Sequence, residues 1–481
     1  MSQLSAENLP DNISRFSYDR DTVTSGIVHF GIGNFHRAHQ AVYVDDLLKS
    51  GAKNWGITGV SLRSPAMRDA LKPQDYLYTL TTLSETTEHR IIGTIKNVLV
   101  APENPDAVTK LIAQPTTQLM SSTITEKGYY LSSGQIDFEH SDLKAELARL
   151  NAPKTIYGFL ASGIIERAKS APSAKLTVMC CDNISKGGEW LRQGTEHLLQ
   201  RHDKSALNWA QNNVSFISSM VDRVCPATDD GLRDLVFEGT KRRDAWPVSA
   251  EPFTQWIIED NFAGKRPDFD RVGAVFVDDI APFERMKLRY LNAAHTIAST
   301  LGYLNGDSYV HEALERPEIF NFMRGALYEN VLPYADVPQG YNGASYIESV
   351  IKRFQNSYLP YGNLQVGTDS SQKIQQRWFP TIDLALSQNS DCNHFAFSLA
   401  AWTVFIQSAL DNDVLNDPKR GAFKDVKAGT SNTNIEAYLN IANADKFAFS
   451  QHSNFMTTVH KWAEVIKANG IKPAIIKFST P

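Results

Sequence analysis

Three polar side chains, those of Lys287, Asn292 and His295, lie within one short segment at helical spacing. The segment from Glu284 to His295 reads ERMKLRYLNAAH and contains Lys287 and Asn292. On an ideal α-helix, at about 100° per residue, Lys287, Asn292 and His295 fall on one broad face. A lysine amine that has lost its extra proton can accept a proton, and an amide can donate a hydrogen bond to a developing oxyanion. The same spacing is also typical of an amphipathic helix with a charged face in solvent.

A second polar cluster follows a predicted strand. Cys181, Asp182 and Asn183 come directly after the apolar run Lys175–Cys180. Open α/β sheets bind ligands at the carboxyl ends of their strands. The Asn183 amide is therefore in a position from which it could reach a reacting oxygen. An Asx-turn that only ends the strand is the alternative.

A glycine-rich turn follows another predicted strand. The run Gly26–Phe30 leads directly into Gly31 and Gly33, and a helix is expected to begin there. In dinucleotide-binding folds the first glycine makes the tight turn and the second lets a pyrophosphate approach the backbone. His36 stands where a third glycine is usual, so a simple strand-to-helix turn is the alternative. Arg37 is either a phosphate contact or a surface residue of the helix.

The end of the next predicted strand bears on the choice of dinucleotide. An acidic side chain there normally binds the adenosine ribose hydroxyls of NAD. This chain has Ser61–Pro65 at that point, and no acidic residue follows before Asp69. Because Arg63 could accept a 2′-phosphate, the local sequence leaves NAD and NADP as alternatives.

These candidate residues need elements that hold them in place. Short β-branched or apolar runs alternate with helical stretches in the first part of the chain, which predicts a parallel sheet covered on both faces. The predicted strands are Gly26–Phe30, Trp55–Leu62, Arg90–Val100, Gln118–Thr125, Lys175–Cys180 and Val272–Val277. The second part is predicted to be mostly helical, with helices at Met286–Leu301, Ile347–Asn356, Phe395–Leu410, Asn434–Asn440 and Met456–Asn469. The predicted domains are residues 1–282 (α/β) and 283–481 (α-helical).

Composition argues against several classes of partner. The 48 basic and 53 acidic residues give a net charge of -5, which offers no case for binding nucleic acid or an anionic membrane. The 4 cysteines are too few for a disulfide framework. Phe395–Leu410 is short and carries polar residues, so a buried helix is expected rather than a membrane span. No signal peptide is recognisable, and we expect a cytoplasmic protein with a small-molecule partner.

The sequence lacks the residues that two common mechanisms of dinucleotide-dependent oxidation require. None of the 17 tyrosines is followed by lysine four positions later, as the Tyr-x-x-x-Lys pair requires. No CxxC or HExxH motif occurs, so no metal site is predicted.

Taken together, the segments resemble the polyol-specific long-chain dehydrogenase family, which includes mannitol 2-dehydrogenases and fructuronate reductases. The resemblance rests on several blocks in family order, which are Gly26–Gln40 (GIVHFGIGNFHRAHQ), Thr123–Tyr129 (TITEKGY), Thr177–Asn183 (TVMCCDN), Met220–Val224 (MVDRV), Glu251–Asn261 (EPFTQWIIEDN), Lys287–His295 (KLRYLNAAH) and Asp369–Lys373 (DSSQK). It implies an N-terminal Rossmann-type domain, a mostly α-helical C-terminal domain and a zinc-free active site.

The resemblance also implies a role for each candidate residue. Lys287 is expected to be the general base, Asn183 and Asn292 an oxyanion hole, and His295 a group that orients the reacting oxygen. Glu284 is expected to pass the proton to solvent. The remaining assignments are cofactor binding by Gly31, Gly33, Asn34, Phe35, Arg37 and Glu126, and substrate binding by Asp222 and Lys373.

The expected activity is the reversible oxidation of D-mannitol to D-fructose with NAD, or with NADP as the alternative, by a monomer or homodimer. Reduction of a keto-uronate such as fructuronate is one alternative, for which Arg377 is a possible carboxylate partner. Oxidation of another polyol, arabinitol or sorbitol, is a further alternative. Two departures from the family concern the substrate side: Gln365 stands where some mannitol-oxidising members have arginine, and Asp369-Ser370-Ser371 replaces Asp-Gly-Ser.

Overall fold

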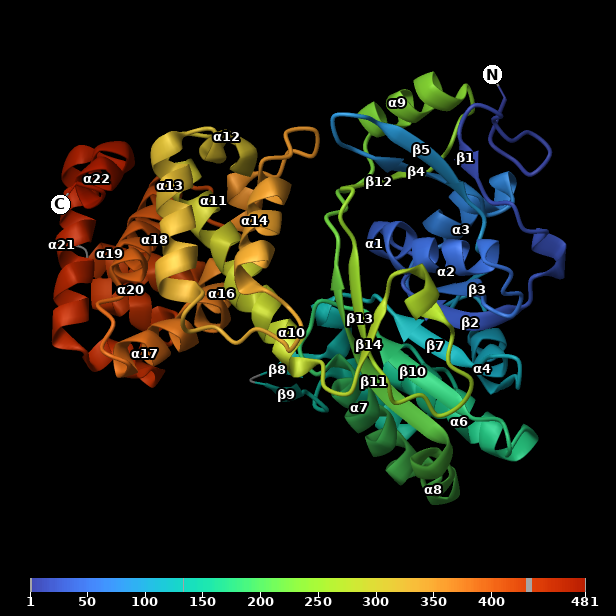
Figure 1. Ribbon diagram of the computed structural model, residues 1–481. Helices are drawn as coiled ribbons and strands as arrows, with labels where there is room; N and C mark the ends of the chain where they lie inside the picture. Colours follow the sequence, from blue (N-terminus) through green and yellow to red (C-terminus); the bar gives the residue numbers. More distant parts are fainter. Residues whose placement is uncertain (1, 133, 430–434, 481) are drawn as a thin grey trace. The chain divides into compact units, whose positions relative to one another are not determined.

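The computed structural model describes residues 2–132, 134–429 and 435–480 of the 481-residue chain. The contacts divide the chain into two compact units, one ending at Ile280 and one beginning at Ala281. The first unit contains the sheets and the second consists of the helices α10 to α22 (Figure 1). The predicted fold class, α/β followed by mostly α-helical, is confirmed.

An eight-stranded sheet forms the centre of the first unit. From one edge to the other its strands are β14 (Val275–Val277), β13 (Gln255–Glu259), β11 (Val214–Asp222), β10 (Leu176–Cys180), β7 (Leu119–Ser122), β2 (Ser25–Phe30), β3 (Gly56–Ser61) and β6 (Ile95–Val100). The strands from β11 to β6 are parallel, and β13 runs antiparallel to β11. Numbered along the chain, the parallel strands have the order 3-2-1-4-5-6 of dinucleotide-binding folds. Their switch point, where ligands bind in such sheets, lies between β2 and β7.

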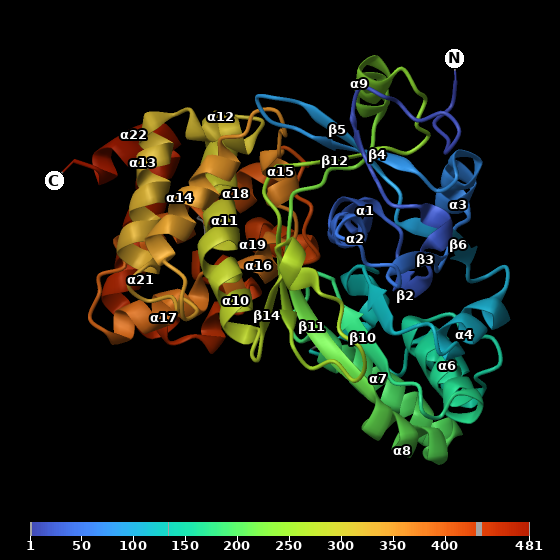
Figure 2. The same ribbon diagram turned by 45° about the vertical axis from the view of Figure 1, so that its right-hand side comes forward.

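Helices cover both faces of this sheet, as the apolar strands predicted. Neighbouring residues alternate between two cores, so that Ile27 and Met179 face one core while Val28 and Val178 face the other. The first core includes α1 (Asn34–Ala38) and α2 (Gln40–Lys49). The second is covered by α4 (Pro105–Ala113), α6 (Ile156–Ser170), α7 (Gly187–His202) and α8 (Lys204–Asn213). Figure 2 shows α6, α7 and α8 together beside β10 and β11.

A second, four-stranded sheet corrects one strand prediction. Its order is β1 (Ser14–Arg15), β5 (Glu88–Ile92), β4 (Tyr78–Thr82) and β12 (Val248–Ala250). The expected single strand Arg90–Val100 is wrong, because the chain leaves this sheet after β5 and enters the large sheet as β6. Gly93 lies at the break, where an added Cβ would come within 2.7 Å of the Phe16 ring. The short pair β8 (Leu131–Ser132) and β9 (Gln135–Ile136) and the helices α3 (Ala66–Leu71), α5 (Ser141–Ala148) and α9 (Asp230–Thr240) complete this unit.

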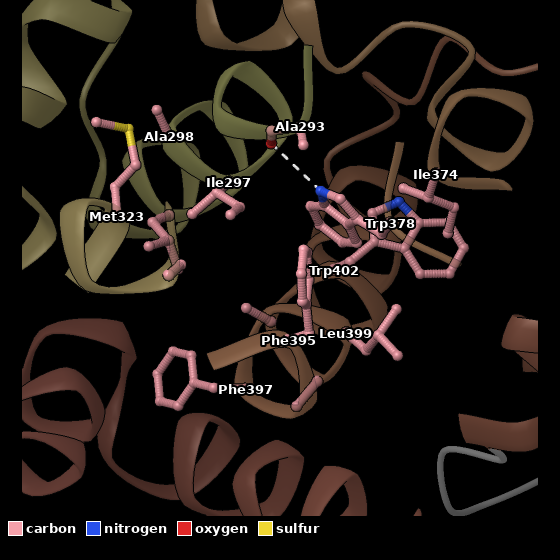
Figure 3. Close-up of a cluster of buried hydrophobic side chains, with 14 of the residues drawn as sticks. Ala293, Ile297, Ala298, Met323, Ile374, Trp378, Phe395, Phe397, Leu399 and Trp402 are labelled. Atoms are coloured by element: carbon pink, nitrogen blue, oxygen red, sulfur yellow. Dashed lines mark hydrogen bonds between the residues drawn. The ribbon is translucent and has the colours of Figure 1, made fainter. Parts of the chain in front are cut away.

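The second unit packs its helices around α18 (Asn393–Asp411), which is buried along most of its length. This is the buried helix expected from Phe395–Leu410, and no helix among the described residues has the length and apolarity needed to cross a membrane. Figure 3 shows Phe395 and Trp402 of α18 beside Trp378 and the α11 residues Ala293 and Ile297. The unit's α-helices are α10 (Ala281–Met286), α11 (Ala293–Asn305), α12 (Val310–Leu314), α13 (Pro317–Gly325), α14 (Gly343–Phe354), α15 (Asn363–Val366), α16 (Ser370–Arg377), α17 (Phe379–Ser387), α18, α19 (Arg420–Gly429), α20 (Ile435–Ile441), α21 (Ser453–Asn469) and α22 (Ile471–Phe478). Asn434, the first residue of one predicted helix, lies outside the described residues.

Two π-helical segments interrupt the helices of this unit. They are η5 (Lys287–Asn292), between α10 and α11, and η6 (Ala326–Val331), after α13, and they contact each other. The backbone N–H of Ala293 donates to the Leu288 carbonyl, and that of Leu332 donates to the Leu327 carbonyl, which is the i→i+5 pattern. The helix predicted over Met286–Leu301 therefore exists, but it is not a continuous α-helix.

Candidate functional site

The π segment η5 begins at Lys287 and ends at Asn292. On an ideal α-helix these residues point about 140° apart. Their separation of five residues is instead the repeat of the i→i+5 pattern, so the π-helix brings their side chains towards the same side of the segment. Both are enclosed, with Lys287 8% and Asn292 7% exposed. The opposite side is anchored by Tyr290, which is fully buried and donates its hydroxyl to the Ala335 carbonyl at 3.1 Å.

His295 lies in the first turn of α11 and has aromatic neighbours. Its imidazole stacks on the Phe354 ring, with 4.0 Å between centroids, and on the Tyr361 ring at 5.7 Å. These contacts define the plane of the ring. Glu284 is half-buried in α10, one helical turn before Lys287.

Helix α16 holds the end of the π segment. The Nη1 group of Arg377 donates to the Asn292 carbonyl at 3.1 Å and to the Thr296 hydroxyl at 2.8 Å. The indole of Trp378 donates to the Ala293 carbonyl at 3.2 Å (Figure 3). Lys373, one turn earlier on α16, is half-buried and donates to the Val366 carbonyl at 3.3 Å. Lys373 and Arg377 thus both belong to α16, the helix that packs on η5.

The two arginines of the Lys287 segment associate with an acidic residue. Arg285 lies 3.5 Å from the Asp336 carboxylate. Asp336 also acts on the pKa of Arg289, which burial lowers. The positive charges of both arginines are therefore partly balanced by Asp336.

The glycine turn lies at the carboxyl end of β2. Gly31 has φ +98, and an added Cβ would come within 2.0 Å of the Thr123 carbonyl, so both the backbone and the space require glycine. Gly33 immediately precedes α1, and a Cβ added there would meet no atom within 4 Å. The first glycine therefore shapes the turn, while the second leaves open space above the backbone that a phosphate could approach.

The residues after the glycines mainly hold the turn together. Asn34 donates to the Pro226 carbonyl at 3.0 Å and to the Thr228 hydroxyl at 2.9 Å. Arg37 is fully buried and donates to the Trp246 carbonyl and to Asn34 Oδ1. It is not the surface residue that one sequence alternative expected. Phe35 is half-buried and stacks on the His39 ring at 5.1 Å.

Asp182 clamps the loop that contains Glu126. Its carboxylate accepts hydrogen bonds from the backbone N–H groups of Ile124 at 3.0 Å and Thr125 at 2.8 Å, and from the Tyr129 hydroxyl at 2.6 Å. Thr125 has φ 67 and ψ 159, a conformation that residues other than glycine rarely adopt. Glu126 and Asn183 are exposed on either side of this clamp. The loop after β7 and the loop after β10 are therefore joined at the carboxyl edge of the sheet.

Asp222 is the last residue of β11, is buried, and lies opposite Gln255 of β13. Sequence reasoning missed the clamp by Asp182 and the contact of Arg377 with the Asn292 backbone. It also missed His29, a buried polar residue in a central strand. A polar side chain within an apolar run was the available signal for His29. Among the described residues, no group of three or more His, Cys, Asp or Glu side chains is arranged to hold a metal ion.

Comparison with known proteins places both units in one family. Residues 25–271 match the mannitol dehydrogenase Rossmann domain, and residues 279–466 match the mannitol dehydrogenase C-terminal domain. A mannitol 2-dehydrogenase of Pyricularia oryzae is 35% identical over 96% of this chain and 94% of its own length. The D-mannonate oxidoreductase of Escherichia coli is 34% identical over 95% of this chain and 96% of its own length.

A solved structure supports the same assignment. The mannitol 2-dehydrogenase of Pseudomonas fluorescens, in a ternary complex with NAD and D-mannitol, has a TM-score of 0.84 and 31% identity, and the match covers 99% of both chains. The chain belongs to the mannitol dehydrogenase family.

Proposed function

We propose that this enzyme catalyses the reversible, dinucleotide-dependent oxidation of D-mannitol to D-fructose, with Lys287 as the general base. The observation that carries the proposal is the enclosure of Lys287 and Asn292 on one π-helical segment. A proton acceptor and an amide donor on one enclosed segment suit the removal of a hydroxyl proton and the binding of the resulting alkoxide.

The residues at the glycine turn fit a dinucleotide. The open space at Gly33 and the turn at Gly31 allow a pyrophosphate to reach the backbone, with Asn34, Phe35 and Arg37 holding the turn. When bound, the nicotinamide accepts the hydride from the carbinol carbon. NAD is the proposed cofactor. NADP remains an alternative, because Arg63 is exposed after β3 and no acidic residue occupies Ser61–Pro65.

Each remaining group has a proposed task in proton transfer or binding. Lys287 takes the proton of the C2 hydroxyl, and Glu284 passes it towards solvent. The amides of Asn183 and Asn292 hold the alkoxide oxygen, and His295 orients it. Lys373 and Asp222 bind the sugar chain, and Glu126 takes part in binding the cofactor.

The proposal is tested with a substrate panel. Purified protein is given mannitol, arabinitol or sorbitol with NAD or NADP, or fructuronate with the reduced dinucleotides, and nicotinamide absorbance is followed. Mannitol should give the highest kcat/KM. A higher value for another polyol, or for fructuronate, would replace mannitol as the substrate, and no turnover with any of them would contradict the proposed activity.

Gly33→Ala is expected to weaken dinucleotide binding without unfolding the protein. The new Cβ meets no protein atom, so the free energy of unfolding should change by less than about 1 kcal/mol. The same methyl group fills the space that a pyrophosphate needs, so the Kd for dinucleotide should rise at least about tenfold, or about 1.4 kcal/mol. Calorimetric titration and urea unfolding measure the two effects. Unchanged affinity would exclude this turn as the phosphate site.

Arg377 bears on the second candidate, reduction of a keto-uronate, which the D-mannonate oxidoreductase relative favours. The Nη1 group of Arg377 supports the backbone of Asn292 and the hydroxyl of Thr296. If that support is its whole role, Arg377→Gln should lower kcat/KM for mannitol and fructuronate by the same factor, about tenfold. If Arg377 also binds a carboxylate, the loss for fructuronate should exceed that for mannitol by a further factor of ten or more. The ratio of the two losses decides between these roles.

A further inference from the structure

A row of buried polar side chains crosses the switch point of the eight-stranded sheet. His29 of β2 lies opposite Ser121 of β7, and both are fully buried. The His29 Nδ1 atom is 2.8 Å from the Ser121 hydroxyl, and its Nε2 atom is 2.9 Å from the Thr123 hydroxyl. A histidine in the centre of a sheet is tolerated because both ring nitrogens have partners. Neither the proposed chemistry nor the packing of the sheet accounts for this arrangement.

The direction of each hydrogen bond follows from counting protons, beginning at the glycine turn. The Thr123 hydroxyl donates to the Gly31 carbonyl at 2.7 Å, and a carbonyl can only accept. This bond uses the single hydroxyl proton of Thr123. The contact between Thr123 and His29 therefore requires a proton on Nε2 of His29.

Counting protons also gives the direction of the hydrogen bonds from His29 to Ser121 and Gln40, at the other end of the row. Burial lowers the pKa of His29 to about 3, so the ring is neutral and carries one proton, which is already on Nε2. Nδ1 must then accept the proton of the Ser121 hydroxyl. The Gln40 side chain is buried beside that hydroxyl, with its Oε1 atom placed 3.0 Å away and its Nε2 atom left without a hydrogen-bond partner, so the chain of hydrogen bonds requires the amide to be turned over. Since Ser121 has no proton left to donate, the amide nitrogen of Gln40 must face it; the nitrogen and oxygen of an amide are assigned by such contacts.

We infer that Gln40, Ser121, His29 and Thr123 form a one-directional hydrogen-bond chain that ends on the Gly31 carbonyl, with His29 as the positioning residue in its neutral Nε2–H form. The His36 ring stacks on His29, with 3.5 Å between centroids, and restricts its tilt. Burial and the neighbouring His29 also lower the pKa of His36, so no charge lies against the chain from that side.

The hydrogen-bond chain ends at Gly31, the residue on which the glycine turn depends. Gly31 adopts φ +98, and its carbonyl lies at the end of β2 and accepts from the Thr123 hydroxyl. By holding this carbonyl, the chain fixes the peptide that leads into Gly33. The inference rests on the proposed function, because its consequence is affinity for a dinucleotide at this turn.

Thr123→Val tests the hydrogen-bond chain, since valine has the shape of threonine without the hydroxyl. The Kd for NAD should rise about tenfold, the size of effect expected when a buried hydrogen bond is lost. At saturating NAD, kcat should fall by less than the Kd rises. Thr123→Ser retains the hydroxyl and should restore the Kd to within about threefold.

Thr117→Val is the matched control. Thr117 is also buried, and its hydroxyl donates to the backbone carbonyl of Leu111 at 2.7 Å. It is not a member of the hydrogen-bond chain. It should lose comparable stability and keep its affinity for NAD. Equal losses of affinity in Thr117→Val and Thr123→Val would overturn the inference, because the effect would then be general destabilisation.

A second measurement reads the unaltered protein, and one variant serves only to assign the signal. In protein with ¹⁵N-labelled histidine, NMR identifies which ring nitrogen carries the proton, and His29→Gln assigns the signal. A neutral Nε2–H ring at neutral pH supports the chain, and an Nδ1–H ring or an imidazolium overturns it. Failure of the unaltered protein to bind NAD or NADP would contradict the proposed function, whereas normal binding by both the unaltered protein and Thr123→Val would contradict the inference alone.

Discussion

Lys287→Ala is expected to lower kcat for mannitol oxidation by about 10²–10⁴-fold, the usual contribution of a positioned general base. The affinity for dinucleotide should be nearly unchanged, because the glycine turn and its supports belong to the other unit of the chain. Alanine favours helix, so the backbone of η5 should persist. Steady-state kinetics and dinucleotide titration measure the two quantities on the same preparation.

The pH profile distinguishes a base from a residue that only supports the fold. Oxidation requires the neutral amine, so kcat/KM of the unaltered enzyme should fall at low pH as the base becomes protonated. This acid limb should be absent from Lys287→Ala. Lys352→Ala, at an exposed position of α14, is the matched control and should leave both kcat and the profile unchanged. A Lys287→Ala enzyme that keeps most of its activity would remove the base from the proposed mechanism.

The strand pattern predicted much of the first unit because buried parallel strands are nearly continuous apolar runs. Gly26–Phe30 and Lys175–Cys180 lie within one residue of β2 and β10. The run Arg90–Val100 misled for a physical reason. Both of its halves favour strand, and only their pairing with different sheets separates β5 from β6. Gly93 was the available signal, since glycine within a strand often marks a bend.

The π segment could not be predicted from local preference. Each residue of Lys287–Asn292 is compatible with an α-helix, and the extra residue in the turn is stabilised by contacts distant in sequence. Tyr290 bonds to Ala335, and Arg377 bonds to the carbonyl of Asn292. The α-helical geometry that predicts one broad face for Lys287 and Asn292 is therefore wrong in detail. The π turn brings the two side chains closer to one side than the α-helix would.

Arg37 shows a different limit of sequence reasoning. A cation next to a glycine turn suggests a phosphate contact, and its alternative was a surface helix residue. The structure instead buries Arg37 and satisfies it with Trp246, which is 209 positions away in the chain. Only the fold could reveal that partner. Arg37 nevertheless bonds to Asn34, so it still acts on the turn by holding its first helical residue.

Asn292→Ala is expected to lower kcat by about 10²–10³-fold, the usual cost of losing one donor of an oxyanion hole. The bonds that Asn292 makes within the described residues use its backbone carbonyl, and its side-chain amide takes part in none of them. Alanine keeps that carbonyl, so the supports from Arg377 and Thr296 remain and the loss reports on the amide. The KM for mannitol should change much less than kcat, because the amide acts most strongly on the charged oxygen of the transition state.

Asn305→Ala, at the other end of α11, is the control for this variant. Its amide bonds to Asp307 at 2.8 Å, so the substitution also removes an asparagine hydrogen bond but should leave kcat within about twofold. Asn292→Asp keeps the shape of the side chain and replaces the donor with a negative charge, which repels an alkoxide. It should be at least as inactive as Asn292→Ala. If Asn292→Asp instead retained most of the activity, the group at this position would serve packing, and the stabilisation of the oxyanion would have to come from another donor.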